Sequence, residues 1–270
     1  MSRLDDTFAA LRARGRTGLI TYVTAGDPDL ERSALVLAAL ARAGADVLEV
    51  GVPFSDPVAD GPVIERAAGR ARRAGGTLST TLDLVARVRP DVRAPIVLFT
   101  YVNPLMAMGE QAFAERAQAA GVDGVLALDL PVEEADGFRR TLASAGIDTI
   151  FLLSPTTTDE RIERASALGR GFLYVISRLG VTGTRAALSE GACELVARIR
   201  RKTTMPIALG FGLSNPEHVR QAGAWADAAV VGSALVGVIE ESDGSPDLVD
   251  RVEGFVRWLK GSEDGEAVAR

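Results

Sequence analysis

Two carboxylates stand in settings that suit acid–base chemistry. Glu49 interrupts the apolar run "DVLEVG" (46–51), so its carboxyl is expected to leave bulk water, and burial raises a carboxyl pKa toward neutrality. Asp60 follows eleven residues later, on a loop that three prolines stiffen. Each acid also has a structural interpretation: Glu49 as the partner of a buried arginine, Asp60 as a turn residue or helix cap. No arginine occupies a predicted strand, which favours proton transfer by Glu49.

Glycine-rich segments recur in the last third of the chain, at "RLGVTGTR" (178–185), "GFGLSNPE" (210–217) and "VVGSAL" (230–235). Glycines let backbone N–H groups approach an anion, and a following helix N-terminus favours negative charge. Any one of these segments reads equally well as a turn. The three together indicate a phosphorylated substrate.

Other catalytic groups are scarce. The chain has two lysines: Lys202 is predicted near the end of a helix, toward the barrel floor, and Lys260 in the last helix. These positions disfavour a Schiff base with the substrate. The single histidine, His218, is predicted on a helix surface, which disfavours histidine-rich metal sites and Ser-His-Asp triads. We expect no metal site, although a carboxylate-bound Mg²⁺ stays open. Acid–base chemistry by carboxylates remains, assisted by a tyrosine on a predicted strand: Tyr22, Tyr101 or Tyr174.

Eight short apolar runs predict the strands that position these groups, at 18–26, 46–51, 95–101, 124–130, 149–155, 171–177, 206–212 and 227–235. Amphipathic segments alternate with them, for example at 30–44, 110–121, 132–146 and 214–224. Strands that are apolar along their whole length are buried on both faces, as in a parallel sheet. Eight even units indicate an α/β fold, a single-domain (β/α)₈ TIM barrel, whose catalytic groups stand at the carboxyl ends of the strands.

The barrel is expected over about residues 18–260 of one domain spanning 1–270, with 261–270 as a flexible C-terminal tail. An extra N-terminal helix within 3–15 could close the barrel floor. Extra helical matter at 62–90 enlarges the second unit.

Composition excludes several classes of protein. A net charge of −6 without a basic stripe argues against nucleic-acid binding. No apolar run approaches the roughly 18 residues needed to cross a membrane, and residues 1–18 lack the apolar core of a secretion signal. The single cysteine, Cys193, excludes an internal disulfide. We therefore expect a cytoplasmic protein that binds neither nucleic acid nor membrane.

Six segments together resemble the tryptophan synthase α subunit family, in order and along nearly the whole chain. They are "GDPDLERS", "GADVLEVGVPFSDPVADGPVIERA", "TYVNPLMAMG", "GVDGVLALDLPVEE", "RLGVTGTR" and "GFGLSNPE". The resemblance implies a lyase of L-tryptophan biosynthesis that cleaves indole-3-glycerol phosphate to indole and D-glyceraldehyde 3-phosphate by a retro-aldol reaction. It implies no cofactor in this chain. The expected partner is a β subunit that carries pyridoxal phosphate, in an allosteric α2β2 heterotetramer.

The resemblance also assigns roles to single residues. Glu49 matches the general acid/base that protonates indole C3 and takes the proton of the glycerol hydroxyl. Asp60 matches the group that stabilises charge on the indole nitrogen, and Tyr174 would help orient the proton transfers. The other matches are, for the substrate phosphate, Gly183, Gly212, Gly232 and Ser233; for the indole and glycerol pocket with its lid, Tyr22, Phe99, Tyr101, Leu126, Asp129 and Thr182; and for the partner interface, Pro53, Asp56, Asn103 and Pro131.

Two other functions would use the same motifs. One is a stand-alone indole-3-glycerol phosphate lyase that releases free indole, and the other is a non-catalytic regulatory barrel. Intact Glu49 and Asp60 disfavour the regulatory barrel. The charges at Glu65, Arg66 and 69–76 ("GRARRAGG") lie beside the expected partner face and leave the cleavage chemistry intact.

Overall fold

Eight parallel strands follow one another around a closed barrel, in which β8 pairs with β1. The computed structural model describes residues 1–176, 190–210 and 212–262. The strands are β1 (Gly18–Thr24), β2 (Val47–Gly51), β3 (Ile96–Thr100), β4 (Gly124–Ala127), β5 (Asp148–Leu153), β6 (Leu173–Ile176), β7 (Ile207–Gly210) and β8 (Ala228–Val231). Each falls on the run predicted for it, and most end earlier because the runs continue into loops at the barrel mouth. The predicted TIM barrel is confirmed.

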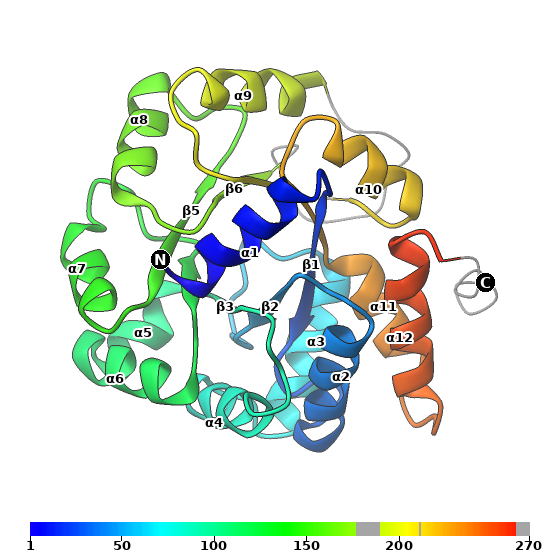
Figure 1. Cartoon of the computed structure of the whole chain (residues 1–270). Helices are drawn as coiled ribbons and strands as arrows, with labels where there is room; N and C mark the ends of the chain where they lie inside the picture. The colour runs from blue at the N-terminus through cyan, green and yellow to red at the C-terminus, as the bar shows by residue number, and fades with distance from the viewer. Residues whose placement is uncertain (177–189, 211, 263–270) are drawn as a thin grey trace.

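Most of the helices form a ring around the strands (Figure 1). The helices are α1 (Arg3–Ala13), α2 (Leu30–Arg42), α3 (Pro62–Arg73), α4 (Leu78–Val88), α5 (Val102–Met108), α6 (Glu110–Ala120), α7 (Asp136–Ser144), α8 (Asp159–Leu168), α9 (Glu190–Arg200), α10 (Pro216–Gly223), α11 (Ser233–Glu241) and α12 (Leu248–Leu259). The extra N-terminal helix is α1, and α3 with α4 fills the extra segment predicted after the second strand. Most of the predicted tail, residues 263–270, lies outside the described residues.

Three details differ from the sequence predictions. Helix α5 was not predicted, because its seven residues are too few to display a helical period and include a proline. Helix α11 begins inside the last predicted strand run, because its apolar residues fit either element. The predicted surface position of His218 is wrong: the side chain is buried in the first turn of α10, where its Nδ1 lies 3.2 Å from the backbone nitrogen of Ser214.

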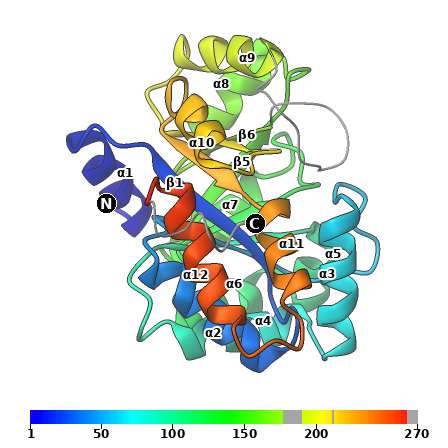
Figure 2. The same ribbon diagram turned by 90° about the vertical axis from the view of Figure 1, so that its right-hand side faces the viewer.

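Helix α1 covers one end of the barrel, the floor. Its apolar residues Leu4, Phe8 and Leu11 join the core inside the barrel, which alternate residues of the strands supply. A capping box at Ser2 and Asp5 satisfies the first backbone N–H groups of α1. In the turned view, α1 lies at one end of the barrel and α3, α5 and α11 lie at the other, the mouth (Figure 2). The predicted closure of the floor is therefore confirmed.

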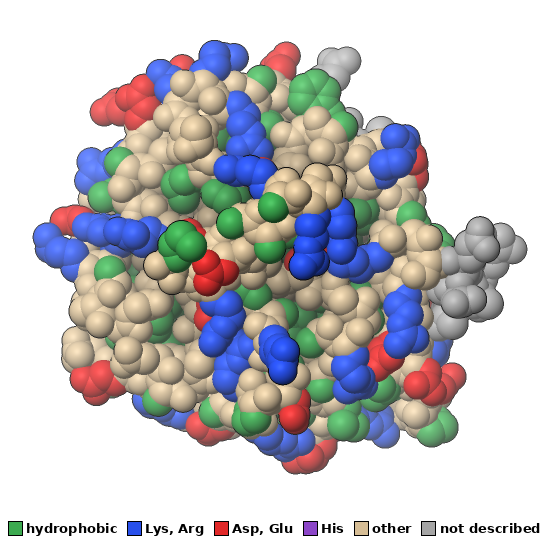
Figure 3. Space-filling view, in the orientation of Figure 1, with side chains coloured by type: hydrophobic (Ala, Val, Ile, Leu, Met, Phe, Trp, Pro, Cys, Tyr) green, Lys and Arg blue, Asp and Glu red, His purple; other side chains and the backbone are tan. Residues whose placement is uncertain are grey.

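Three aspartates at the floor stand just before β2, β4 and β8: Asp46, Asp123 and Asp227. Each carboxylate accepts a backbone N–H of the neighbouring strand at 2.8 Å, from Leu19, Ile96 and Ile207 in turn. A cationic side chain lies against each carboxylate: Lys260, Arg89 and Arg200. Lys and Arg side chains accordingly surround α1 on this face (Figure 3). The floor is therefore built for stability, as is typical of this fold.

Within the described residues, no helix is long and apolar enough to span a membrane. The same part of the chain contains no group of three or more His, Cys, Asp or Glu side chains that could hold a metal ion.

Candidate active site

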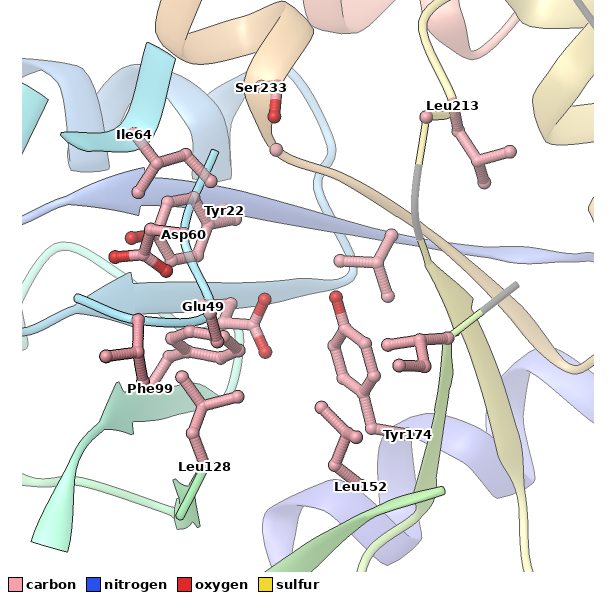
Figure 4. Close-up of a pocket in the computed structure, with 16 residues that line it drawn as sticks. Tyr22, Glu49, Asp60, Ile64, Phe99, Leu128, Leu152, Tyr174, Leu213 and Ser233 are labelled. Carbon is pink, nitrogen blue, oxygen red and sulfur yellow. The ribbon is translucent and has the colours of Figure 1, made fainter. Parts of the chain in front are cut away.

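The mouth of the barrel opens into a cavity of about 340 Å³ (Figure 4). Its walls come from the upper ends of the strands, from the loop after β2 and from the first turns of α3 and α11. The lining residues are Tyr22, Glu49, Val58, Ala59, Asp60, Ile64, Phe99, Leu128, Leu152, Tyr174, Ile176, Gly212, Leu213, Val230, Gly232 and Ser233. Most of these side chains are apolar or aromatic. The cavity therefore suits a largely apolar ligand with a few polar groups.

Glu49 projects from β2 into this cavity. Its strand neighbours are Tyr22 on β1 and Val97 on β3, and the side chain is 1% exposed. Neither carboxyl oxygen has a hydrogen-bond partner among the described residues. Burial raises the pKa of Glu49 to about 8. The group is therefore protonated at neutral pH and can serve as a general acid.

Asp60 also borders the cavity, on the same side as Glu49 and Tyr22 in Figure 4, and lies directly before the N-cap Gly61 of α3. Burial raises its pKa to about 6, against a hydrogen bond from the Tyr101 hydroxyl that lowers the pKa. The Tyr101 hydroxyl in turn accepts the backbone N–H of Ala59 at 3.1 Å, which fixes the end of the loop. At neutral pH the cavity thus contains one protonated and one ionised carboxyl, an arrangement that lets two acids take different roles.

Aromatic rings form one side of the cavity. Tyr22 and Phe99 meet edge to face with centroids 5.3 Å apart, and Tyr174 lies 6.4 Å from Phe99. Each tyrosine leans over a strand glycine: a Cβ added to Gly51 would lie 2.2 Å from the Tyr22 hydroxyl, and one added to Gly210 would lie 2.6 Å from the Tyr174 hydroxyl. The glycines therefore leave room for rings that can enclose a planar aromatic ligand.

The N-terminus of α11 points at the other side of the cavity. Gly232 caps this helix and Ser233 is its first residue, and both line the cavity. Gly212 faces them from the loop after β7 with a φ of +77°. Free N–H groups and the helix dipole make such a helix end a site for an anion.

Comparison with known proteins assigns the family. Residues 8–262 match the sequence family described as tryptophan synthase alpha chain. The chain belongs to the tryptophan synthase alpha chain family. The alpha chain of Geobacter sulfurreducens is 48% identical over 260 residues, which are 96% of this chain and 98% of that one. The alpha chain of Synechococcus elongatus is 48% identical over 269 residues, 99% of each.

Solved structures agree with this assignment. Tryptophan synthase subunit alpha from Legionella pneumophila matches with a TM-score of 0.86 at 35% identity, over 96% of this chain and 97% of that one. A chain of Mycobacterium tuberculosis tryptophan synthase matches with a TM-score of 0.89 at 36% identity, over 96% of each. The chain is thus a lyase of tryptophan biosynthesis, as its family resemblance implied.

Most positions that the family resemblance assigned to the site meet at this one cavity: Glu49, Asp60, Tyr174, Tyr22, Phe99, Gly212, Gly232 and Ser233. Tyr101 stands behind Asp60 as its hydrogen-bond partner. Leu126 lies in the barrel core and Asp129 lines a neighbouring hollow, so neither borders the cavity. Thr182 and Gly183 lie outside the described residues.

The four positions expected at a partner interface are not equivalent. Asp56, Asn103 and Pro131 are exposed on loops and α5 at the mouth. Pro53 is buried, and its ring lies 2.9 Å from where a Cβ of Gly76 would stand. Pro53 can therefore shape the loop after β2 but does not present a free surface.

Sequence reasoning missed several apolar lining residues, among them Leu128, Leu152 and Ile176. Each stands two residues beyond another inward-facing residue of its strand, and the period of two could have identified them. Ile64 and Val58 had no such signal, because their approach to the cavity depends on the path of the loop and α3.

Proposed function

We propose that this chain cleaves indole-3-glycerol phosphate to indole and D-glyceraldehyde 3-phosphate, with Glu49 as the general acid/base and Asp60 as its electrostatic partner. One observation carries the proposal: a fully buried, unpartnered carboxyl on the cavity wall, within a cavity that offers aromatic rings on one side and a helix N-terminus on another. A carboxyl without a partner among the described residues is available to a substrate atom.

The substrate fits the cavity in one orientation. Its indole belongs among Tyr22, Phe99 and Leu128, beside Glu49 and Asp60. Its phosphate belongs at Gly212, Gly232 and Ser233, where backbone N–H groups favour an anion. The glycerol carbons then cross the space in front of Tyr174 and Glu49, where Figure 4 shows both side chains pointing inward.

The reaction needs an electron sink, and the substrate supplies it. Protonated Glu49 gives its proton to indole C3, and the ring becomes an indolenine with positive charge on its nitrogen. Ionised Asp60 stabilises that charge. The Glu49 carboxylate then takes the proton of the glycerol hydroxyl next to the ring. The C–C bond breaks, the hydroxyl carbon becomes the aldehyde of glyceraldehyde 3-phosphate, and the bond electrons return to the indole. Glu49 ends protonated, as it began.

The partner is proposed to be a β subunit that carries pyridoxal phosphate, in an α2β2 assembly. Asp56, Asn103 and Pro131 would contribute to the contact. Two large apolar side chains at the same end, Val58 and Met106, are 82% and 70% exposed, which is typical of a surface that another protein covers.

The test is indole release by the purified chain in the presence of a β subunit from the same source. We expect Glu49→Gln to lower kcat by about 10²–10⁴-fold, which is the usual contribution of general acid–base catalysis. Asp60→Asn should lower kcat more than it raises KM, because the charge it stabilises develops after binding. Both variants should bind glycerol 3-phosphate like the unmodified chain. Normal turnover by Glu49→Gln, or none by the unmodified chain, would reject the proposal.

A further inference from the structure

The arginines of α3, in the charge-rich stretch after β2, bond to an acid of α11, and the cleavage chemistry does not explain this contact. Helix α3 begins two residues after Asp60, and α11 begins at the proposed phosphate site, so both helices start at the cavity. The two helices pack side by side at the mouth of the barrel (Figures 1 and 2). Arg66 and Arg70 stand on α3 one turn apart, and both point at Glu240 near the end of α11.

These residues form a continuous ionic network. Arg66 donates to both carboxylate oxygens of Glu240, at 2.8 and 2.7 Å. Arg70 donates to Glu240 at 2.6 Å and to both oxygens of Asp27 at 2.7 and 3.0 Å. The Asp27 side chain is completely buried and that of Arg70 is 13% exposed, so this part of the network is shielded from water. A buried, bidentate pair such as Arg70–Asp27 holds geometry better than an exposed one. Glu240 of α11 is 28% exposed and joins this pair through its single bond to Arg70.

An apolar contact links the same two helices close to the cavity. Ile64 and Ala67 of α3 pack with Val236 of α11 and with Tyr22. The helices are therefore joined at two levels, by apolar packing beside the site and by the ionic network at their outer ends. Asp27 extends the network to the loop after β1, three residues beyond Thr24, whose hydroxyl contacts Tyr22.

We propose that Arg70 and Glu240 are positioning residues that lock α3 to α11, so that a phosphate bound at α11 fixes Asp60 relative to the indole. The proposal rests on the proposed function, since it assumes the phosphate at α11 and the role of Asp60. Because α3 and α11 both begin at the cavity and are joined along their length, we expect that ordering the start of α11 also orders the start of α3.

The chemistry of arginine matters here. The planar guanidinium of Arg70 reaches Asp27 and Glu240 at once, in two directions fixed by its fork. A lysine keeps the charge but cannot hold both acids in this geometry. Arg70→Lys therefore loosens the lock and keeps the positive charge, and Glu240→Gln loosens it while Arg70 keeps Asp27 as its acid partner. Neither change removes much volume.

The chain offers a control pair on two other helices. Arg87 of α4 donates to both oxygens of Glu31 of α2, at 2.6 Å each, so it is bidentate as Arg66 and Glu240 are, with side chains 46% and 79% exposed. Neither helix begins at the cavity. Arg87→Lys and Glu31→Gln should therefore reproduce the loss of an ion pair without the loss of positioning.

The first measurement is hydrogen exchange with and without saturating glycerol 3-phosphate, which needs no turnover. In the unmodified chain and the two controls, the ligand should protect backbone amides at the start of α11 and also in residues 58–66. In Arg70→Lys and Glu240→Gln, protection at α11 should remain and protection of 58–66 should fall at least threefold. Equal protection of 58–66 in all variants overturns the proposal. Absence of protection at α11 in the unmodified chain instead refutes the phosphate site, and with it the basis of the lock.

The second measurement is steady-state cleavage well below the unfolding temperature. The two variants should lower kcat by about 10- to 100-fold, since a misplacement of about 1 Å can cost 10²-fold, while the controls stay within about twofold. In an Asp60→Asn background the same variants should change kcat by less than about twofold, because they act through Asp60. An equal loss in both backgrounds would reduce Arg70 and Glu240 to a structural role and overturn the proposal.

Discussion

The feature of Glu49 that points to function is the absence of a hydrogen-bond partner among the described residues. Buried acids are usually paired or hydrogen-bonded, because an isolated charge is costly away from water. Glu49 is 1% exposed and meets no partner among the described residues, so its proton stays on at neutral pH. Asp60 differs because the Tyr101 hydroxyl hydrogen-bonds its carboxylate. Two acids in one cavity therefore differ in protonation, largely because their surroundings raise the two pKa values by different amounts.

This difference predicts a bell-shaped pH profile of kcat/KM. The rate should rise as pH passes about 6, because Asp60 must be ionised, and should fall above about 8, because Glu49 must be protonated. Asp60→Asn should remove the acidic limb and retain the alkaline one. The substrate phosphate also ionises near pH 6. The pH dependence of glycerol 3-phosphate inhibition serves as the control for that ionisation, and an acidic limb that survives Asp60→Asn would contradict the assignment.

Among single residues, the sequence predicted the two acids but not all of the side chains that line the cavity. Glu49 was recognisable from its apolar neighbours and Asp60 from the family motif. Leu126 was placed at the cavity, whereas Leu128 borders it, since a strand segment of four residues leaves the depth of each side chain undefined. The pairing of Arg70 with Asp27 and Glu240 joins residues 43 and 170 positions apart, which no local pattern reveals.

At the scale of the elements, the proposed anion site is formed by backbone with little contribution from side chains. Helix α11 presents its N-terminus, and Gly212 brings the loop after β7 opposite it with a φ of +77°. A backbone with this φ suits glycine, and other residues lose about 1–2 kcal/mol there. The geometry of the proposed phosphate site therefore depends on a backbone conformation rather than on a charged side chain.

Gly212→Ala should accordingly weaken phosphate recognition. We expect KM to rise about 5- to 30-fold, which corresponds to about 1–2 kcal/mol, with a smaller change in kcat. Gly244→Ala is the control: its φ is +78° and a Cβ there meets nothing within 4 Å, so it carries similar strain between α11 and α12, far from the cavity. Steady-state kinetics and thermal unfolding separate the two effects, and equal KM changes in both variants would refute the site.

Elements were predicted best where a regular pattern of apolar positions runs through them. The eight strands and α2, α3 and α4 follow from period and composition, since a full period of apolar positions is present. The short helix α5 and the start of α11 depend on packing at the mouth, where apolar residues suit helix and strand alike. These are also the elements that shape the site and its rim.

On the scale of the whole molecule, one end of the barrel carries stability and the other carries function. At the floor, Asp46, Asp123 and Asp227 bond to backbone and cations. At the mouth, Glu49 has no hydrogen-bond partner among the described residues, and Val58 and Met106 are exposed. Apolar side chains that remain exposed at the functional end fit a contact with a partner that affects turnover.

A β subunit should therefore raise the rate of indole release, and Met106→Lys should reduce that stimulation by about 10-fold while leaving turnover of the isolated chain within about twofold. A buried charge at an interface centre is costly, which accounts for the direction and size of the effect. Leu35→Lys is the control, because Leu35 is 55% exposed on α2, in the outer ring. Rapid release without β that β does not change would point to a stand-alone lyase.

Helix α1 closes the end of the barrel opposite the cavity and so limits where the product can leave. Below Glu49 the barrel interior is filled by core side chains, and Leu4, Phe8 and Leu11 of α1 cover the floor. Among the described residues, this packing leaves no route to the floor for indole, a small apolar product. It must leave by the mouth, toward whatever protein is docked there. A helix that takes no part in the chemistry thus decides where the product is delivered.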